Sequence, residues 1–408
     1  MTQRAHRAAQ AECSVLLTGV TGFLGREILC QLLTESNAHV SCLVRARTAA
    51  EARNRLIAAL DALFGREAAR MLQARVSAVR GDVTLPRLGM TPRRREHVLR
   101  RTTHVIHSAA SVRFDLPLAD ARRINGGGTV AMLDFAQEAF RRGRLQRMVY
   151  VSTAFVSGRH REPFAEDQLD VGQRFRNTYE QSKFEAELVV HARQQTVPTT
   201  VVRPSIVIGD SRWGATTTFN VIYWPLRVYA DGLLRLAPAD PSLPVDVVPV
   251  DYVARGTIAA LFDGQAGTTY ALAAGERASD ARVIGALAAR AFGVAPPRFV
   301  SGVLGGVMVP LVSSALRVGP WRRFGNAARQ YLPYFRDGSR FDTRNATGLL
   351  GPQGIEPPST SQLLEPVLEY ARSTDFGRDR TAVAARQRDV SRQRRLALTR
   401  SLEAQPVG

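Results

Sequence analysis

The chain has 408 residues, 45% of them hydrophobic, which is enough for two domains or for one large domain with an appendage. The formal net charge is +19, but no basic cluster with interleaved aromatic residues accompanies it, which argues against a nucleic-acid-binding protein. A basic surface that attracts polyphosphate cofactors, coenzyme A or an acidic carrier protein fits better, and solvated arginine-rich faces explain part of the excess charge.

The cysteines also exclude some classes of protein. Cys13, Cys30 and Cys42 show neither a CxxC pair nor a Cys/His ligand spacing, so the sequence predicts no disulfide framework and no metal site. Residues 1–12 form an N-terminal tail without the apolar core of a secretory signal. We therefore expect a cytoplasmic protein.

The first recognisable element is a strand followed by a glycine-rich turn and a helix. Residues 14–18 are apolar, the turn carries Gly19, Gly22 and Gly25, and a helical pattern of apolar residues follows. Glycines in this setting let the backbone approach a pyrophosphate at the helix N-terminus. This pattern predicts a dinucleotide-binding domain.

The end of the second strand, residues 39–45, bears on the choice of cofactor. An acidic residue there would bind the ribose 2′-hydroxyl of NAD, whereas the chain has Arg45 and, two residues later, Arg47. Arginines suit the 2′-phosphate of NADP, and Arg55 on the predicted helix 51–64 can join them. The alternative is a set of solvent-facing arginines in an arginine-rich protein.

The next two predicted strands, 75–80 and 103–110, each lead to residues of interest. Asp82 follows the first strand and either accepts from the adenine amino group or caps a turn. The second strand ends in Ser108, Ala109 and Ala110, where bulkier residues would block a cofactor, and its two histidines are interpreted as structural or as supporting residues.

Asn125 precedes three glycines and the predicted helix 130–140. Two roles remain open for it. It either N-caps that helix or organises water near the tyrosine described next.

The chain is organised around the stretch from the strand 147–152 to a helix that carries Tyr179 and Lys183. Residues four apart lie on one helical face, so both side chains reach the same cleft. Lys183 is the only lysine among 55 cationic residues. Its ammonium group is expected to lower the pKa of Tyr179 and make it a general acid, with a hydroxyl from Ser152 or Thr153 beside it. Such a set suits hydride transfer to a carbonyl.

After a strand at 199–209 the composition of the chain changes to aromatic, apolar and then proline-rich segments. The repeated strand–helix pattern over residues 13–209 predicts an α/β fold, a Rossmann-type doubly wound parallel sheet, with a smaller substrate-binding part at 210–375. That part includes a helix from about 252, a strand at 268–274 and a helix at 359–372. The basic tail 376–408 is expected to be a solvated helix or disordered, without chemistry.

The segment 299–321 is the most apolar of the chain, yet its uncharged run is marginal for a membrane-spanning helix. Three interpretations remain. It forms a lid over a lipophilic pocket, an interfacial helix in peripheral contact with a membrane, or an ordinary buried helix.

Several sequence blocks carry a resemblance to a known family. TGVTGFLG and YEQSK resemble the extended short-chain dehydrogenase/reductases over roughly residues 13–375. CLVRA, HSAASVRFD, YVSTAFVSG, VVRPSIVIGDS, VDVVPVDYVA and YLPYF…FDTRN narrow the resemblance to the branch that contains fatty acyl-CoA reductases and thioester reductase domains, the male-sterility-type NAD-binding domains. One departure is Gly126, where relatives carry a branched residue.

The resemblance implies NADPH-dependent reduction of an acyl thioester to an aldehyde, with further reduction to an alcohol left open. It implies that Thr153, Tyr179 and Lys183 are catalytic. It also implies a cofactor-binding set. That set is Gly19, Thr21, Gly22, Phe23, Leu24, Gly25, Arg45, Asp82, Val83, Ser108, Ala109 and Lys183. We add Arg55, Tyr179, Pro204 and Ser205 as further candidates for cofactor binding. Because the sequence contains no adenylation or carrier domain, we expect the acyl group to arrive on coenzyme A or on a separate acyl carrier protein.

Two other functions compete with this one. The same fold serves sugar-nucleotide epimerases or dehydratases and hydroxysteroid-type dehydrogenases. A tightly bound NAD would favour the epimerase, and alcohol-dependent reduction of NAD(P) would favour the dehydrogenase. A dinucleotide-sensing regulator without turnover is the non-enzymatic alternative, and the intact Thr153, Tyr179 and Lys183 set argues against it.

Overall fold

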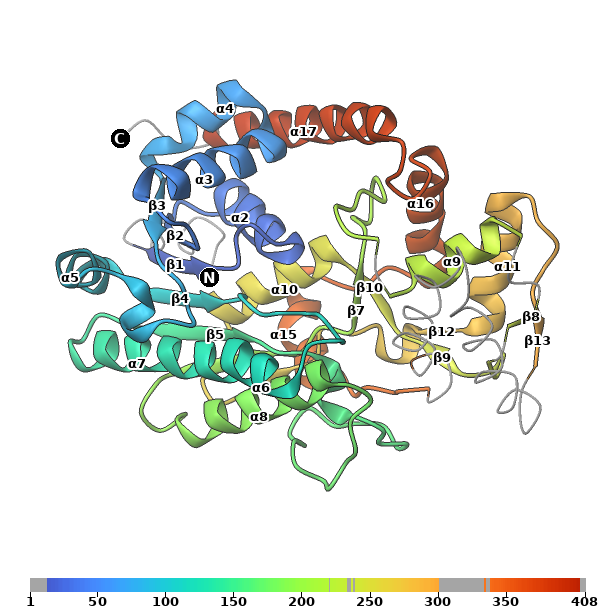
Figure 1. The fold of residues 1–408 in the computed structure, drawn as a ribbon, viewed down its shortest axis with the longest axis horizontal. Coiled ribbons are helices and arrows are strands. Elements are labelled where there is room, and N and C mark those ends of the chain that lie inside the picture. Colours follow the sequence, from blue (N-terminus) through green and yellow to red (C-terminus); the bar gives the residue numbers. More distant parts are fainter. Residues whose placement is uncertain are drawn as a thin grey trace.

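In a computed structural model the chain folds around a seven-stranded sheet (Figure 1). The structure describes residues 13–219, 221–232, 236–237, 239–300, 334 and 338–403. The strand order is β11-β6-β5-β4-β1-β2-β3, and every pairing is parallel. The strands are β1 (Ser14–Thr18), β2 (His39–Val44), β3 (Val76–Arg80), β4 (His104–His107), β5 (Arg147–Val151), β6 (Thr199–Val202) and β11 (Thr269–Tyr270). This arrangement confirms the predicted α/β fold with a doubly wound sheet.

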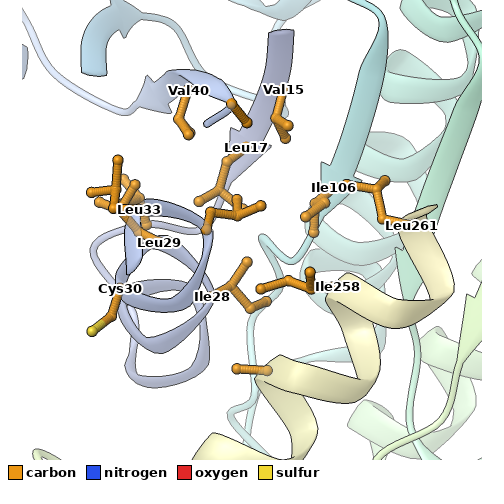
Figure 2. Close-up of a cluster of buried hydrophobic side chains, with 14 of the residues drawn as sticks. Val15, Leu17, Ile28, Leu29, Cys30, Leu33, Val40, Ile106, Ile258 and Leu261 are labelled. Carbon is orange, nitrogen blue, oxygen red and sulfur yellow. The ribbon is translucent and has the colours of Figure 1, made fainter. Parts of the chain in front are cut away.

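Helices cover both faces of the sheet (Figure 1). The first face is covered by α2 (Phe23–Glu35), α3 (Ala49–Phe64) and α10 (Val250–Phe262). The second is covered by α5 (Pro92–Arg101), α7 (Gly128–Arg141) and α8 (Thr178–Ala192). Alternate residues of β1 therefore enter different cores: Val15 and Leu17 pack with α2 and α10, as Figure 2 shows, and Leu16 packs on the opposite face. Successive side chains of a strand point to opposite faces of the sheet. Because both faces are buried here, each of Val15, Leu16 and Leu17 is apolar, and the apolar run is uninterrupted.

The order of the strands positions the site. The chain moves outward from β1 through β2 to β3, and then returns to place β4 on the other side of β1. The carboxyl ends of β1 and β4 thus flank the point where the winding reverses, which is where open α/β sheets form their ligand crevice.

The remaining elements build a second packed region beside the sheet. Its strands are β7 (Ile206–Ile208), β8 (Leu236–Ala237), β9 (Pro244–Val245), β10 (Val247–Pro249), β12 (Ser279–Asp280) and β13 (Arg298–Phe299). Its helices are α9 (Tyr223–Ala230), α11 (Ala281–Phe292), α15 (Arg344–Leu350) and α16 (Thr360–Ser373). Short helices α4 (Arg66–Met71) and α6 (Leu118–Ala121) belong to the first region. A separate apolar cluster, with Ile208, Tyr223, Ile284 and Leu364 among its members, fills the second region.

The predicted strand 199–209 ends early. The sequence predicts that Pro204 and Ser205 end it and that the chain leaves the sheet there. The chain does leave the main sheet after β6, while β7 is a separate strand that pairs with β10. Pro204 lies at the break and has no N–H to donate to a ladder, although Arg203 still donates to the carbonyl of Tyr270. The predicted strands 103–110 and 268–274 are also shorter, at His104–His107 and Thr269–Tyr270.

The basic tail, expected to be a solvated helix or disordered, is a helix with mostly exposed residues and one docked face. Residues Arg380–Glu403 form α17, which lies along α3 and α2 (Figure 1). Its buried face carries Val390, Arg394 and Leu398 at a spacing of four, and the Arg394 guanidinium contacts the Glu27 carboxylate at 2.5 Å and that of Asp210 at 3.7 Å. The ion pairs explain how so polar a helix can dock.

Among the described helices, none combines the length and the apolar character needed to span a membrane. The apolar segment 299–321, for which three interpretations remain, lies outside the described residues from position 301 onward.

A buried ion pair joins α8 to the end of β6. The Arg203 guanidinium donates to one oxygen of Glu187 from Nε at 2.8 Å and from Nη2 at 2.6 Å, and both side chains are at most 2% exposed. The Ser152 hydroxyl donates to the other carboxylate oxygen. Although burial alone would raise the pKa of Glu187, Arg203 and these donors lower it to about 2.

We expect Glu187→Gln to lower the free energy of unfolding by about 3–5 kcal/mol, because it leaves the buried Arg203 without a counter-ion. Urea unfolding near neutral pH measures this change. The control is Asp134→Asn, which removes the exposed partner of Arg193 and should cost less than about 1 kcal/mol. Equal losses in the two variants would show that the buried pair does not stabilise the fold as described.

Candidate active site

The carboxyl ends of the central strands surround a cavity of about 410 Å³. It lies between the glycine-rich turn after β1, the chain after β4 and β5, α8, and the segment that leaves β6. Eleven of the predicted site residues line it. They are Gly19, Gly22, Phe23, Leu24, Gly25, Ser108, Thr153, Tyr179, Lys183, Pro204 and Ser205.

The glycine-rich turn packs so closely that side chains cannot be accommodated. Gly19 has φ +83°, and a Cβ there would lie 2.8 Å from the backbone of Ser108. A Cβ on Gly25 would lie 2.1 Å from the carbonyl oxygen of Gly19. The helix α2 starts directly after this turn with no side-chain cap and no acidic residue in its first turn. The free N–H groups and the glycine cradle fit a pyrophosphate.

The helix α8 presents Tyr179 and Lys183 to this cavity from one face. Asn177 begins the helix by accepting a hydrogen bond from the Glu180 N–H at 3.0 Å. Thr153, which follows β5, is hydrogen-bonded to Tyr179, and its hydroxyl also approaches the Pro204 carbonyl at 3.4 Å. Two hydroxyl groups therefore converge at one point of the cavity wall.

Lys183 is 3% exposed, and its ammonium group is directed to β5 and not to Tyr179. Its Nζ donates to Tyr150 Oη at 2.7 Å and to the Val151 carbonyl at 2.8 Å. Burial lowers the pKa of Lys183 to about 7, although the Glu187 carboxylate acts in the opposite direction.

The expectation that Lys183 lowers the pKa of Tyr179 is wrong for this structure. Burial raises the pKa of Tyr179 to about 12, and only the hydrogen bond to Thr153 acts against it. The lysine does not offset this effect because its ammonium group is bound to Tyr150 and Val151. At neutral pH, Tyr179 is therefore a neutral phenol that can donate a hydrogen bond.

Asn125 is not the N-cap of a helix, because residues Arg122–Gly127 form a wide helical turn that runs straight into α7. Its side chain accepts from the Ser111 N–H at 2.8 Å and donates to the Ser111 carbonyl and to Ser182 Oγ at 3.1 and 2.9 Å. It thus ties the chain after β4 to α8, one residue before Lys183.

Six predicted cofactor residues lie outside the cavity lining. Thr21 and Ala109 belong to the glycine turn and to the chain that packs against it. Val83 packs against Gly128 at the start of α7. Asp82 caps its own turn by accepting from the N–H and hydroxyl of Thr84 at 2.9 and 2.8 Å, which is one of the two roles left open for it.

Of the two predicted arginines, Arg45 directly follows β2 and Arg55 lies on α3, from which its guanidinium donates to the backbone carbonyl of the exposed Arg45. Arg80 at the end of β3 approaches the Ala46 carbonyl at 3.4 Å and joins them. Arg80 is not recognisable from the sequence, because only the pairing of β2 with β3 brings it to this turn.

An aromatic wall beside the catalytic residues was not predicted from the sequence either. Phe114 stacks between Tyr179 and Tyr334, with ring centroids 5.6 and 5.5 Å apart, and Phe155 meets Tyr334 edge-on at 4.9 Å. Asn177 donates to Tyr334 Oη at 2.9 Å. Phe114 and Phe155 belong to two of the sequence blocks that carry the resemblance. Their place in those blocks is the only sequence feature that could have indicated a role at the site.

The two histidines of β4 are buried. His107 Nδ1 lies 2.9 Å from Thr18 Oγ1, and burial and Lys183 together lower the pKa of His107 to about 3. It is therefore neutral. Within the part of the chain that the structure describes, no group of three acidic, His or Cys side chains is arranged to hold a metal ion.

Comparisons with known proteins agree with this geometry. Residues 17–257 match the family model described as male sterility protein. The chain is 31% identical over 285 residues to the fatty acyl-CoA reductase wat of Drosophila melanogaster, covering 61% of this chain and 54% of that protein. It is 32% identical over 281 residues to the large subunit of the L-2-aminoadipate reductase of Penicillium chrysogenum, covering 64% of this chain and 19% of that protein. The chain therefore spans about half the length of the first relative and a much smaller part of the second.

Among solved structures, the fold is similar to the terminal R domain from the myxalamid PKS-NRPS biosynthetic pathway. The TM-score is 0.74 at 26% sequence identity, and the match covers 89% of this chain and 91% of that one.

The ionisation of Lys183 is directly measurable, since it is the only lysine of the chain. Protein labelled with carbon-13 at lysine Cε gives one lysine resonance in an NMR pH titration. We expect a midpoint near pH 7, because burial disfavours the ammonium form, which is present below that pH and lost above it. The same protein unfolded in urea should titrate near the ordinary value of about 10.4. A folded-state midpoint near that ordinary value would contradict the described burial.

Proposed function

The chain belongs to the male sterility protein family of NAD-binding domains, and we propose on that basis that it is an NADPH-dependent reductase of acyl thioesters. The observation that carries the proposal is the cavity in which the hydroxyl groups of Thr153 and Tyr179 converge beside Lys183, under an aromatic wall. The relatives named fatty acyl-CoA reductase and the R domain of a biosynthetic pathway support it.

The chemistry divides between a cofactor and the chain's own residues. A bound nicotinamide dinucleotide supplies hydride to the carbonyl carbon, and the glycine turn with the uncapped start of α2 would hold its pyrophosphate. Thr153 and Tyr179 donate hydrogen bonds to the carbonyl oxygen as negative charge develops there. Tyr179 suits this role because it is neutral at working pH. The C–S bond then breaks, the thiolate leaves, and an aldehyde results.

The character of the cavity favours an acyl substrate over a sugar nucleotide. Lys183 is the one charged side chain among the described residues that line it. Apolar surface of the cavity comes from Val112, Phe114, Phe155, Ile206 and Val207. A sugar with many hydroxyl groups would leave its polar groups unpaired on such walls, whereas an acyl chain gains from burial there.

Three arginines, two at the ends of β2 and β3 and one on α3, favour NADP over NAD. Arg45, Arg55 and Arg80 gather at the turn after β2, where no acidic residue takes the position that would bind a ribose 2′-hydroxyl. The net charge of +19 further suits an acidic donor of the acyl group, either coenzyme A or an acyl carrier protein.

Thioester reduction is tested by following NADPH absorbance with acyl-CoAs from short to very long chain and with an acylated carrier protein. We expect oxidation that depends on chain length. Tyr179→Phe should lower kcat by about 10²–10⁴, because it removes the proton donor at the carbonyl oxygen. The matched control is Tyr270→Phe, which removes a buried phenol hydroxyl that bonds the Gln265 backbone at the far edge of the sheet and should leave the rate unchanged.

Failure of this test has distinct forms. Oxidation of alcohols with reduction of NADP would indicate a dehydrogenase, and a tightly bound NAD would indicate an epimerase. Cofactor binding without turnover of any carbonyl compound would favour a sensor. Each of these results would contradict the proposed reduction of thioesters.

Cofactor choice is tested by Arg45→Ala. We expect the KM for NADPH to rise about tenfold, which corresponds to one charge-assisted hydrogen bond, and the KM for NADH to stay the same. The control, Arg70→Ala, removes an exposed arginine of α4 and should change neither value. An equal effect of Arg45→Ala on both cofactors would argue against a 2′-phosphate site.

A further inference from the structure

The catalytic lysine is held by a tyrosine that the proposed reaction does not use. Tyr150 lies on β5 with 0% exposure, and its Oη accepts a hydrogen bond from Lys183 Nζ at 2.7 Å. The same ammonium lies 4.1 Å from the centroid of the Tyr150 ring. Tyr150 therefore supports the charge with both its oxygen and its ring.

The hydrogen bond between Lys183 and Tyr150 has a fixed direction. An ammonium group only donates, so the Tyr150 oxygen must accept from Lys183. Nearby, Thr129 donates its single proton to the Asn125 carbonyl at 2.6 Å, and its oxygen lies 3.5 Å from His107 Nε2.

We propose that Tyr150 is a positioning residue that keeps Lys183 in its ammonium form at the wall of the cavity, by accepting a hydrogen bond with its phenol oxygen and by placing its ring beside the charge. Its consequence for rate rests on the proposed function. A charged Lys183 at the cavity wall stabilises the negative charge that develops on the carbonyl oxygen held by Thr153 and Tyr179. Without Tyr150 Oη, the buried ammonium keeps its bond to the Val151 carbonyl but loses the shorter of its bonds to β5.

The other groups around Lys183 do not replace this support. The Glu187 carboxylate, one turn further along α8, is already bound by Arg203 and Ser152. His107, which faces the site from β4, is kept neutral by burial. Tyr179 is neutral because burial raises its pKa to about 12.

The test is the lysine NMR titration on Tyr150→Phe. Phenylalanine keeps the ring and removes only the hydroxyl, so the midpoint reports the hydrogen bond itself. We expect the midpoint to fall by about one pH unit, because the variant loses a hydrogen bond made to the charged form. Tyr270→Phe, a buried tyrosine of β11 in the same sheet, is the control and should leave the midpoint where it is in the parent protein.

Kinetics give a second readout. With the midpoint lowered by about one unit, the charged fraction of Lys183 at pH 7 falls from about one half to about one tenth, so kcat at that pH should fall about fivefold. The loss should be recovered at lower pH, which a merely structural defect would not show.

Incorporation of 3-fluorotyrosine at position 150 keeps the ring and the hydroxyl but makes the phenol oxygen a weaker acceptor. It should shift the midpoint in the same direction by less, which keeps the proposal testable if Tyr150→Phe does not fold. An unchanged midpoint in the folded variants would overturn the proposal. Absence of thioester turnover in the parent protein would overturn the proposed function alone, because the titration needs no substrate.

Discussion

One face of α8 fixes the geometry of the site through buried charge. Tyr179, Lys183 and Glu187 follow one another at a spacing of four, and Glu187 is fully enclosed. A buried carboxylate is tolerated only when it is paired, so Glu187 must meet Arg203 from the end of β6 and Ser152 from the end of β5. These contacts pin the helix to the carboxyl ends of the two strands that supply Thr153 and Pro204 to the cavity.

Enclosure of these groups determines which chemistry each can perform. Burial makes the Lys183 ammonium easier to deprotonate and the Tyr179 phenol harder, so the pair does not contain a ready-made phenolate. A neutral tyrosine beside a threonine hydroxyl is a donor set, suited to a carbonyl oxygen that becomes negative. The proposed role of Tyr150 is to keep the lysine charge available in this enclosed place, through its oxygen and its ring.

The sequence predicted the elements whose signals are local. The glycine turn, the spacing of Tyr179 and Lys183, and the alternation of strands and helices all depend on near neighbours in the chain. Tyr150, Arg80 and Tyr334 could not be assigned in this way, because strand order and pairing bring them to the site. The docking of α17 could not be predicted because the middle position of its docked face is an arginine, Arg394, and not an apolar residue. The helix therefore lacks the apolar stripe by which a packed helix is recognised in a sequence.

The most direct test of the central claim measures thiol release together with NADPH oxidation in one reaction with a long-chain acyl-CoA. Thioester reduction breaks the C–S bond, so we expect one free coenzyme A thiol for each NADPH when the aldehyde is the product, and one for every two NADPH when the alcohol is. NADPH oxidation without thiol release would mean that another carbonyl is reduced, and would contradict the assignment of this site to acyl thioesters.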